Sequence, residues 1–121
     1  MANQIAVTAC DNELVILAFT TTASFEICRI LSGNSNPVSV TVNITAGIYE
    51  GTIVLNGVNQ ALNVTLPATL PSGAYSVMLF GLNWGGPTAF NVNVNGTPYT
   101  LPLQNLPAGL TFNKGPISIT V

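Results

Sequence analysis

Few side chains in this sequence could do chemistry. Among its 121 residues there are two basic residues, four acidic residues and no histidine. Without an imidazole, a Ser-His-Asp or Cys-His nucleophile and a histidine-based metal site are excluded. The six charged residues, which any remaining ionic chemistry must use, are Asp11, Glu13, Glu26, Arg29, Glu50 and Lys114.

The carboxylates leave two chemical options. Glu26 and Glu50 could act as the acid and base of a glycosidase, because that reaction needs only two carboxyl groups. Asp11 and Glu13 are the one close pair that could contribute to a calcium site. The alternative reading of both pairs is that acidic side chains on strands simply face solvent. We favour that alternative and expect no enzyme activity, no metal site and no cofactor.

Two cysteines, Cys10 and Cys28, are separated by 17 residues. An even number of cysteines in a chain of extracellular type predicts a disulfide, which would contribute about 3 kcal/mol for a loop of this size. The alternative is two small buried residues that never meet. The alternation of the sequence also places Cys28 on the same strand face as Glu26, which weakens the case for a disulfide in the core. A catalytic thiolate is disfavoured, since Arg29 is its one charged neighbour of the right sign.

Asparagine occurs in three glycosylation sequons, at Asn43, Asn63 and Asn95. Each lies on the polar phase of a predicted strand or in a turn, so each side chain is expected to face solvent. We predict that they carry glycans if the protein is exported from an organism that glycosylates. Chance is the rival explanation, because 14 Asn and 21 Ser and Thr among 121 residues give about two sequons at random.

One tryptophan, Trp84, follows Asn83 and precedes two glycines in a predicted loop. An exposed indole can stack on a sugar ring while a neighbouring amide hydrogen-bonds to its hydroxyls. Trp84 and Asn83 are therefore a candidate glycan contact. The competing interpretation is that the indole fills a hydrophobic space beneath the loop.

The elements that position these residues follow from an apolar-polar alternation of period two, which predicts strands with one buried face. Asn56-Gly57 and Asn95-Gly96 predict two-residue hairpins, because a type I′ turn needs positive φ at both central residues. Loops are expected at 33–37, 67–73, 84–87 and 102–109. The expected strands are 5–9, 13–21, 25–31, 38–44, 48–55, 62–66, 74–82, 90–94, 97–101 and 117–121.

No segment shows the apolar stripe of a helix. The pattern therefore predicts a single all-β domain over residues 1–121, an antiparallel β-sandwich of immunoglobulin-like or jelly-roll type with about eight to ten strands. The segment LPSGAYSVML, from Leu70 to Leu79, resembles immunoglobulin-like modules of prokaryotic surface and pilus-like proteins, in which a Leu-Pro-x-Gly-x-Tyr corner opens a long strand. The resemblance implies an extracellular β-module that is often repeated or polymerised, and it supplies no binding residues.

The low charge also limits the partners. Two basic residues far apart in the sequence argue against nucleic-acid binding, which needs a patch of Lys and Arg. The longest apolar run, Leu14 to Phe19, is far shorter than the roughly 20 residues of a spanning helix, so we expect no membrane insertion. The numbered chain has no recognisable signal peptide, and we expect an extracellular, cell-surface or virion location.

Outward strand positions are expected to carry Asn, Thr and Ser, which can pack against protein without desolvating charge. This predicts a structural subunit that associates with copies of itself in an extracellular filament, a pilus-like fibre or a virion coat. The alternating strands at both termini could complete a neighbour's sheet or close the protein's own sandwich. The alternative function is a carbohydrate-binding module or lectin. The residues predicted for the terminal assembly strands are Ile5, Val7, Ile117, Ile119 and Val121.

Overall fold

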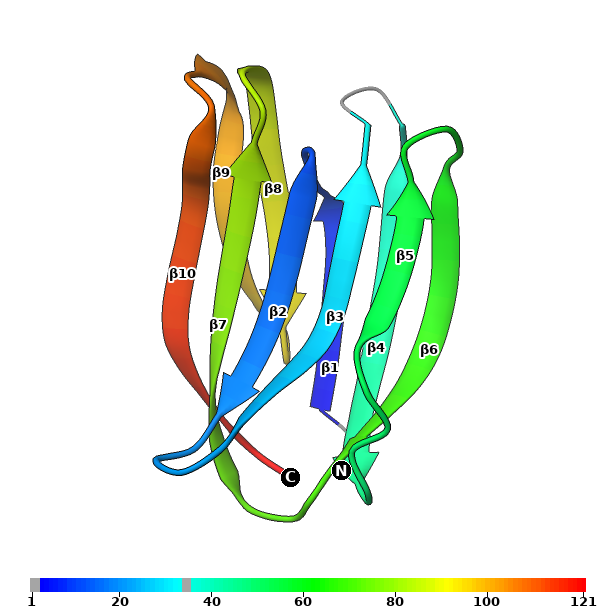
Figure 1. The fold of residues 1–121 in the computed structure, drawn as a ribbon, viewed down its shortest axis with the longest axis vertical. Coiled ribbons are helices and arrows are strands. Elements are labelled where there is room, and N and C mark those ends of the chain that lie inside the picture. The colour runs from blue at the N-terminus through cyan, green and yellow to red at the C-terminus, as the bar shows by residue number, and fades with distance from the viewer. Residues whose placement is uncertain (1–2, 34–35) are drawn as a thin grey trace.

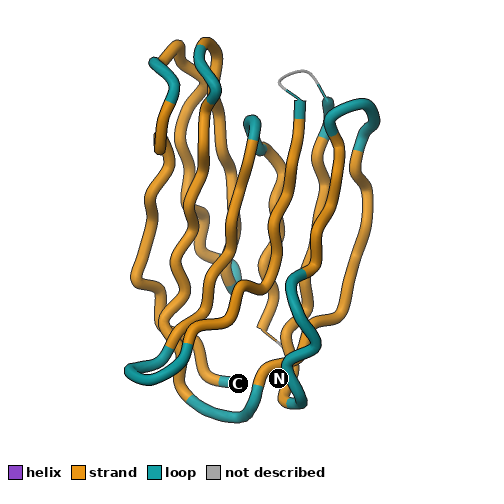
Figure 2. Tube along the Cα trace, in the orientation of Figure 1, coloured by secondary structure: helices purple, strands orange, loops and turns teal. Residues whose placement is uncertain are grey.

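Two five-stranded sheets pack face to face in the structure, a computed structural model that describes residues 3–33 and 36–121 (Figure 1). Strands joined by short loops make up the described chain, and it contains no helix (Figure 2). The predicted all-β sandwich is therefore confirmed. The strands are β1 (Asn3–Ala9), β2 (Glu13–Phe19), β3 (Ser24–Ser32), β4 (Val38–Ala46), β5 (Ile53–Gly57), β6 (Leu62–Leu70), β7 (Ala74–Asn83), β8 (Gly86–Val94), β9 (Thr97–Leu106) and β10 (Gly109–Thr120).

The first sheet, sheet A, has the strand order β6-β4-β1-β8-β9, and the second, sheet B, has the order β10-β7-β2-β3-β5. Sheet B lies toward the viewer in Figure 1. One flank of the sandwich is formed by β5 and β6, and the opposite flank by β9 and β10. This order decides which strands have an unpaired edge.

The core lies between the sheets and is built from alternate residues of each strand, as the period-two pattern predicts. Two phenylalanines from different sheets, Phe90 and Phe112, stack with ring centroids 5.0 Å apart. Gly81 makes room for them, because a Cβ atom at this position would lie 2.5 Å from Cζ of Phe90. The largest fully buried side chains also include Ile5, Leu14, Ile16, Ile30, Ile44, Leu70 and Leu79.

Strand direction departs from the prediction at one flank. Six of the eight described strand pairings are antiparallel, but β3 pairs with β5, and β4 with β6, in parallel. The chain crosses between the sheets at each connection from β3 to β6, so strands that are two apart in sequence become parallel neighbours. A hairpin at this flank is therefore impossible.

The two Asn-Gly pairs consequently differ. At Asn95-Gly96 both φ angles are positive, at 50° and 91°, and the turn joins the antiparallel strands β8 and β9, which confirms that hairpin. The hairpin predicted at Asn56-Gly57 is wrong, because β5 and β6 lie in different sheets. Gly57 instead allows close packing, since a Cβ there would lie 2.8 Å from Cγ of Leu62.

Other boundaries also differ from the prediction, since β6 continues to Leu70 through the first half of the predicted loop at 67–73, and β8 begins at Gly86 instead of residue 90. Residues 48–52, predicted as the start of a strand, lie outside any strand, and the carbonyl of Ile48 accepts a hydrogen bond from the Thr69 hydroxyl. Most of the predicted loop at 102–109 is strand, since β9 continues to Leu106 and β10 begins at Gly109. Long strands thus replace predicted loops at the flank formed by β9 and β10.

Candidate association surfaces

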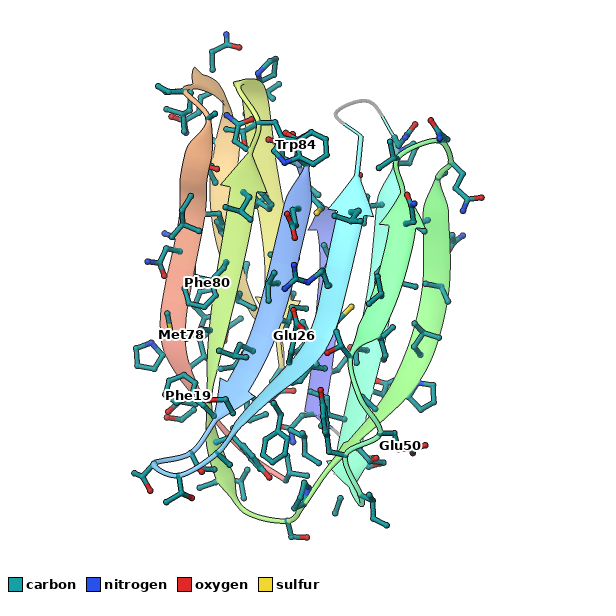
Figure 3. The ribbon with its side chains drawn as sticks, in the orientation of Figure 1. Phe19, Glu26, Glu50, Met78, Phe80 and Trp84 are labelled. Atoms are coloured by element: carbon teal, nitrogen blue, oxygen red, sulfur yellow. The ribbon has the colours of Figure 1, made fainter. Side chains whose placement is uncertain are left out.

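The outer face of sheet B is apolar along its two central strands. In β2 and β7 the inward residues are buried, yet most of the alternate residues that face outward are apolar as well; the exceptions are Glu13 and Ser76. The apolar residues lie directly opposite one another, with Val15 paired to Phe80 and Leu17 to Met78. We call this set the apolar face; its residues, all partly exposed, are Val15, Leu17, Phe19, Met78, Phe80 and Leu82. Phe19, Met78 and Phe80 are labelled on it in Figure 3.

The outer face of sheet A is polar and neutral. Ala6 at its centre lies between Thr41 of β4 and Asn93 of β8. This polar face carries the amides and hydroxyls predicted for all outward positions, and on sheet B that prediction is wrong. Its other polar residues include Ser39, Asn43, Asn63, Thr65, Asn91 and Thr100.

Three of the six charges gather beside the apolar face. Nη1 of Arg29 lies 2.8 Å from Oε1 of Glu13, and Nη2 lies 2.6 Å from Oε1 of Glu26. The hydrogen bond to Glu26 and the two negative charges raise the pKa of Arg29. The Thr52 hydroxyl donates to Oε2 of Glu26. Glu26 is thus held in an ion-pair cluster, and this engagement distinguishes it from the free acid or base that a glycosidase requires.

Asp11 and Glu13, the pair considered and disfavoured as part of a calcium site, face different environments. Glu13 faces outward to Arg29, whereas Asp11 is buried at the end of the sandwich, and its Oδ2 has no hydrogen-bond partner among the described residues. Burial raises the pKa of Asp11, against the opposing effect of hydrogen bonds from Thr88 and from the backbone of Asn12. Within residues 3–33 and 36–121, no three His, Cys, Asp or Glu side chains cluster in a way that could hold a metal ion.

The predicted disulfide is absent from the structure, where Cys10 and Cys28 are both buried free thiols. Cys28 pairs with Ile16 in the middle of β2, whereas Cys10 precedes β2 and donates from its thiol to the carbonyl of Asp11. The two cysteines therefore lie at different levels along the strands. Burial raises the pKa of both thiols, that of Cys28 to about 11, so neither has the character of a reactive thiolate.

The sequon asparagines lie where the pattern places them. Asn43 and Asn63 are on the polar face, and Asn95 is in the exposed β8–β9 turn. Asn95 is tied down at both ends of its amide, because Oδ1 accepts from the backbone of Gln4 and Nδ2 donates to Asn3. Asn63, exposed on the edge strand β6, is the most open of the three attachment sites. Glycosylation stays a prediction.

The Trp84 and Asn83 pair separates into two roles. Trp84 is 61% exposed, so it does not fill a space beneath its loop. It lies at the end of the sandwich opposite the chain termini (Figure 3). Asn83 is only 2% exposed, and Nδ2 donates to the carbonyl of Leu106 while Oδ1 accepts from the backbone of Gly85. A glycan contact through Asn83 is therefore wrong, because its amide holds the loop together.

The two terminal strands that were predicted to pair with a neighbouring copy lie in different positions in the sandwich. The strand β1, with Ile5 and Val7 buried in the core, lies at the centre of sheet A between β4 and β8. In the single chain it therefore closes the protein's own sandwich, the second of the two readings given above, and its role as an exchanged strand stays a prediction. The C-terminal strand β10 is an edge strand, and Ile117 and Ile119 pair with β7 while Val121 bonds to Gly73. Its other edge is unpaired in the described chain.

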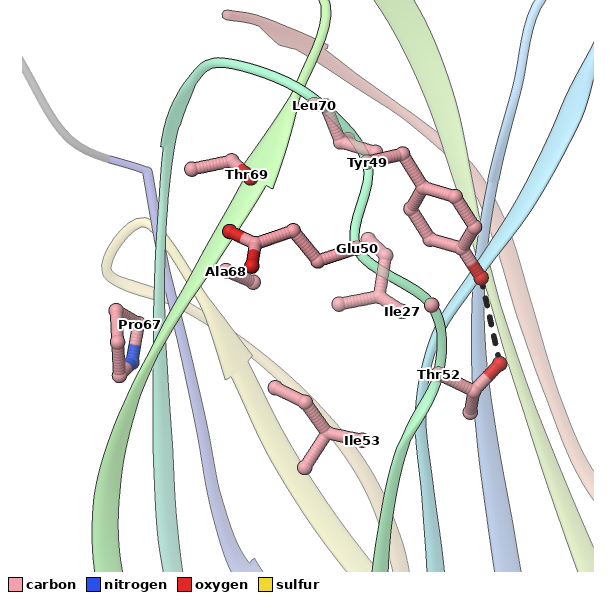
Figure 4. Close-up of a pocket in the computed structure, with 10 residues that line it drawn as sticks. Ile27, Tyr49, Glu50, Thr52, Ile53, Pro67, Ala68, Thr69 and Leu70 are labelled. Carbon is pink, nitrogen blue, oxygen red and sulfur yellow. Dashed lines mark hydrogen bonds between the residues drawn. The ribbon is translucent and has the colours of Figure 1, made fainter.

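A cleft of about 240 Å³ opens at the flank formed by β5 and β6 (Figure 4). Ile27, Ile53 and Leu70 give it an apolar floor. The exposed Glu50 extends across it toward β6 and is the one charged residue in its lining. Glu50 and Glu26, the two carboxylates of the disfavoured glycosidase option, lie apart in role: Glu50 lines this cleft, and Glu26 belongs to the cluster with Arg29.

Comparison with protein-family models, with curated proteins and with solved structures finds no match to this chain. The resemblance to immunoglobulin-like surface modules therefore stays a prediction. Its corner is closed by a hydrogen bond of 2.6 Å from the Tyr75 hydroxyl to the carbonyl of Pro71. In the part of the chain that the structure describes, no helix has the length and apolar character to cross a membrane.

Proposed function

We propose that this protein is a non-enzymatic structural subunit that associates with copies of itself in an extracellular filament, a pilus-like fibre or a virion coat. The observation that carries the proposal is the apolar face of sheet B. In a sandwich whose outer surface meets water, strands alternate apolar and polar residues, whereas strands that are apolar on both faces are typical of sheets covered on both sides. β2 and β7 have the second pattern but are covered on one side only.

The charge distribution supports the same proposal. The apolar face itself carries no charge, and the charges next to it are neutralised to a net −1 by the contacts of Arg29 with Glu13 and Glu26. A partner that covers this face would bury apolar surface without leaving a charge unpaired. The net charge of −2 for the whole chain also leaves little repulsion between copies.

Sedimentation velocity over a wide concentration range, followed by negative-stain microscopy, tests the proposal. We expect the wild-type protein to associate as its concentration rises, and Leu17→Thr with Phe80→Thr to remain monomeric. Thr41→Ala with Asn93→Ala, two truncations on the polar face, is the matched control and should associate like the wild type. A wild-type protein that stays monomeric at every concentration contradicts the proposal.

The second candidate function is glycan binding, and the exposure of Trp84 favours it. An indole exposed beside a glycine turn is available for stacking on a sugar ring. A glycan array read with the wild type and with Trp84→Ala distinguishes the two functions. Binding that is lost in the variant supports a lectin, and the absence of binding to any glycan removes this candidate.

A further inference from the structure

The two edges of sheet B differ from the edges of sheet A. An edge strand presents unpaired backbone N–H and C=O groups that can pair with another chain, and proline on the edge prevents such pairing. β6 contains Pro67, and β9 contains Pro98 and Pro102. β5 has no proline, and β10 has none before Pro116. The edges open to strand addition are therefore β5 and the first half of β10, on opposite flanks of the same sheet.

These two open segments lie at the same level of the sheet. Successive pairings link Ile53 of β5 to Cys28, Ile16, Leu79 and finally Lys114 of β10. The links continue to Asn56, which reaches Leu110, with one register irregularity between Leu110 and Phe112 of β10.

The neighbouring residues of β5 are linked across sheet B to neighbouring residues of β10 by the same succession of pairings. Val54 is linked in the same way to Asn113, and Leu55 to Phe112. A second copy placed beside the first would bring two open edges together in register.

Strand direction is also compatible. β5 runs parallel to β3, and each further step across β2, β7 and β10 is antiparallel. The direction of β10 is therefore opposite to that of β5. Two copies in the same orientation would meet through antiparallel strands, the arrangement with the stronger ladder.

We propose that β5 of one copy pairs with residues 109–114 of β10 in a second copy, so that sheet B continues from copy to copy. The proposal rests on the self-association proposed above and adds a second contact, at the edges of sheet B, to the one through the apolar face. The contact joins two different surfaces, so it repeats without closing unless the rotation per copy closes a ring. The twist between neighbouring strands, about −20° each, accumulates over five strands and makes the array helical.

Charge complementarity supports a second copy of the protein as the partner of the β5 edge. Of the six charged side chains, three form the cluster around Arg29, and Asp11 is buried. Glu50 and Lys114 remain, both exposed, of opposite sign and on opposite flanks. In the proposed contact Lys114 lies beside Ile53, which shares the cleft with Glu50. The apolar floor of that cleft suits the methylene chain of a lysine.

Disulfide trapping tests the pairing. Val54, which is 60% exposed, and Asn113 face outward in the same row at opposite edges, so a bond between cysteines at these positions within one copy is impossible. Mild oxidation of Val54→Cys with Asn113→Cys should give a ladder of covalent oligomers beyond the dimer on a non-reducing gel. Each single variant should stop at the dimer. The matched control is Val54→Cys with Thr100→Cys. It moves the second thiol from β10 to β9, which lies on the same flank as β10 but in sheet A, so it should give no ladder.

Charge reversal gives a second readout. Lys114→Glu should raise the concentration at which half the protein is assembled about fivefold, because it places like charges at the contact. Adding Glu50→Lys should restore the wild-type value. Ser39→Glu, which adds a negative charge on the polar face, controls for net charge and should have no such effect.

The outcomes separate this inference from the proposed function. A wild-type protein that assembles, with no ladder from the Val54 and Asn113 cysteines and no rescue by Glu50→Lys, overturns the edge contact and leaves self-association intact. A wild-type protein that never assembles overturns both. A ladder together with the charge rescue establishes the β5–β10 contact.

Discussion

The outer faces of the two sheets are built on opposite patterns. On sheet A, Thr41 and Asn93 alternate with buried valines, so one side of each strand is wet. On sheet B, the partly exposed Leu17 and Phe80 alternate with buried apolar residues. Both the inner and the outer side of these strands are therefore apolar at their centre. A sandwich needs only one apolar side per sheet. The second apolar side of sheet B is the surface that the proposed association would cover.

The largest expected difference lies within one strand, between neighbours that face opposite ways. Leu79 is fully buried, and Leu79→Ala should lower the free energy of unfolding by about 2–5 kcal/mol. Phe80 faces outward, and Phe80→Ala should cost less than about 1 kcal/mol in dilute protein. Urea unfolding at low concentration measures both. Equal losses would show that the face of Phe80 is already covered within one copy.

Asp11 is a buried charged residue of the sandwich, and its effect on the free energy of unfolding depends on pH. Burial raises the pKa of Asp11, so the folded protein takes up a proton at higher pH than the unfolded chain does. The contribution of Asp11 to stability is thus present below the ordinary carboxyl pKa and is lost as pH rises through the folded pKa.

Asp11→Asn keeps the shape and removes the charge. The variant should have nearly the wild-type urea midpoint at acid pH and a higher midpoint at pH 7, with the gap opening as pH rises. Midpoints measured at several pH values check this. A gap of constant size, or a wild type that is the more stable at pH 7, would contradict the assignment.

The cluster beside the apolar face should matter more for association than for stability. The Arg29 side chain is 41% exposed, so Arg29→Ala should lower the free energy of unfolding by less than about 1 kcal/mol. The variant leaves two carboxylates unpaired beside the contact and should weaken association.

Restoring neutrality is the control for that prediction. Arg29→Ala combined with Glu13→Gln and Glu26→Gln should recover association in sedimentation experiments. If the Arg29→Ala protein associated as strongly as the wild type, the result would show that the cluster around Arg29 does not contribute to the interface.

The smallest effect is expected at Trp84, which lies at the end of the sandwich and away from both faces. Trp84→Ala should change the free energy of unfolding by no more than about 0.5 kcal/mol and leave association unaltered. Sedimentation and urea unfolding measure both quantities. If this variant failed to assemble, the result would show that the interface includes the end of the molecule at Trp84 and would contradict its assignment to the apolar face alone.

Much of the fold could be predicted from the sequence because alternation reports burial directly. The strand positions and the Asn95-Gly96 hairpin follow from local preferences, and the structure has them. Asn56-Gly57 has the same local signal, but the crossing between sheets overrides it. Local sequence does not encode which sheet receives the next strand, so the parallel pairs at this flank were beyond prediction.

The candidate surface was less predictable than the fold. Its signal in the sequence is the uninterrupted apolar run from Leu14 to Phe19, which is too short for a membrane-spanning helix but makes both faces of one strand apolar. The second half of the surface comes from β7, and only the pairing of Leu17 with Met78 brings the two together. The cleft at Glu50 likewise depends on β6 lying across from residues 49–53.

Hydroxyl-radical footprinting tests the role of the apolar face most directly, because it reports the solvent exposure of each side chain. We compare the oxidation rate of Met78, on the apolar face, in dilute and in concentrated protein, with Trp84 as the internal reference. We predict that Met78 becomes protected several-fold on assembly while Trp84 keeps its rate. An assembled protein in which Met78 is oxidised as fast as in the monomer would contradict the account.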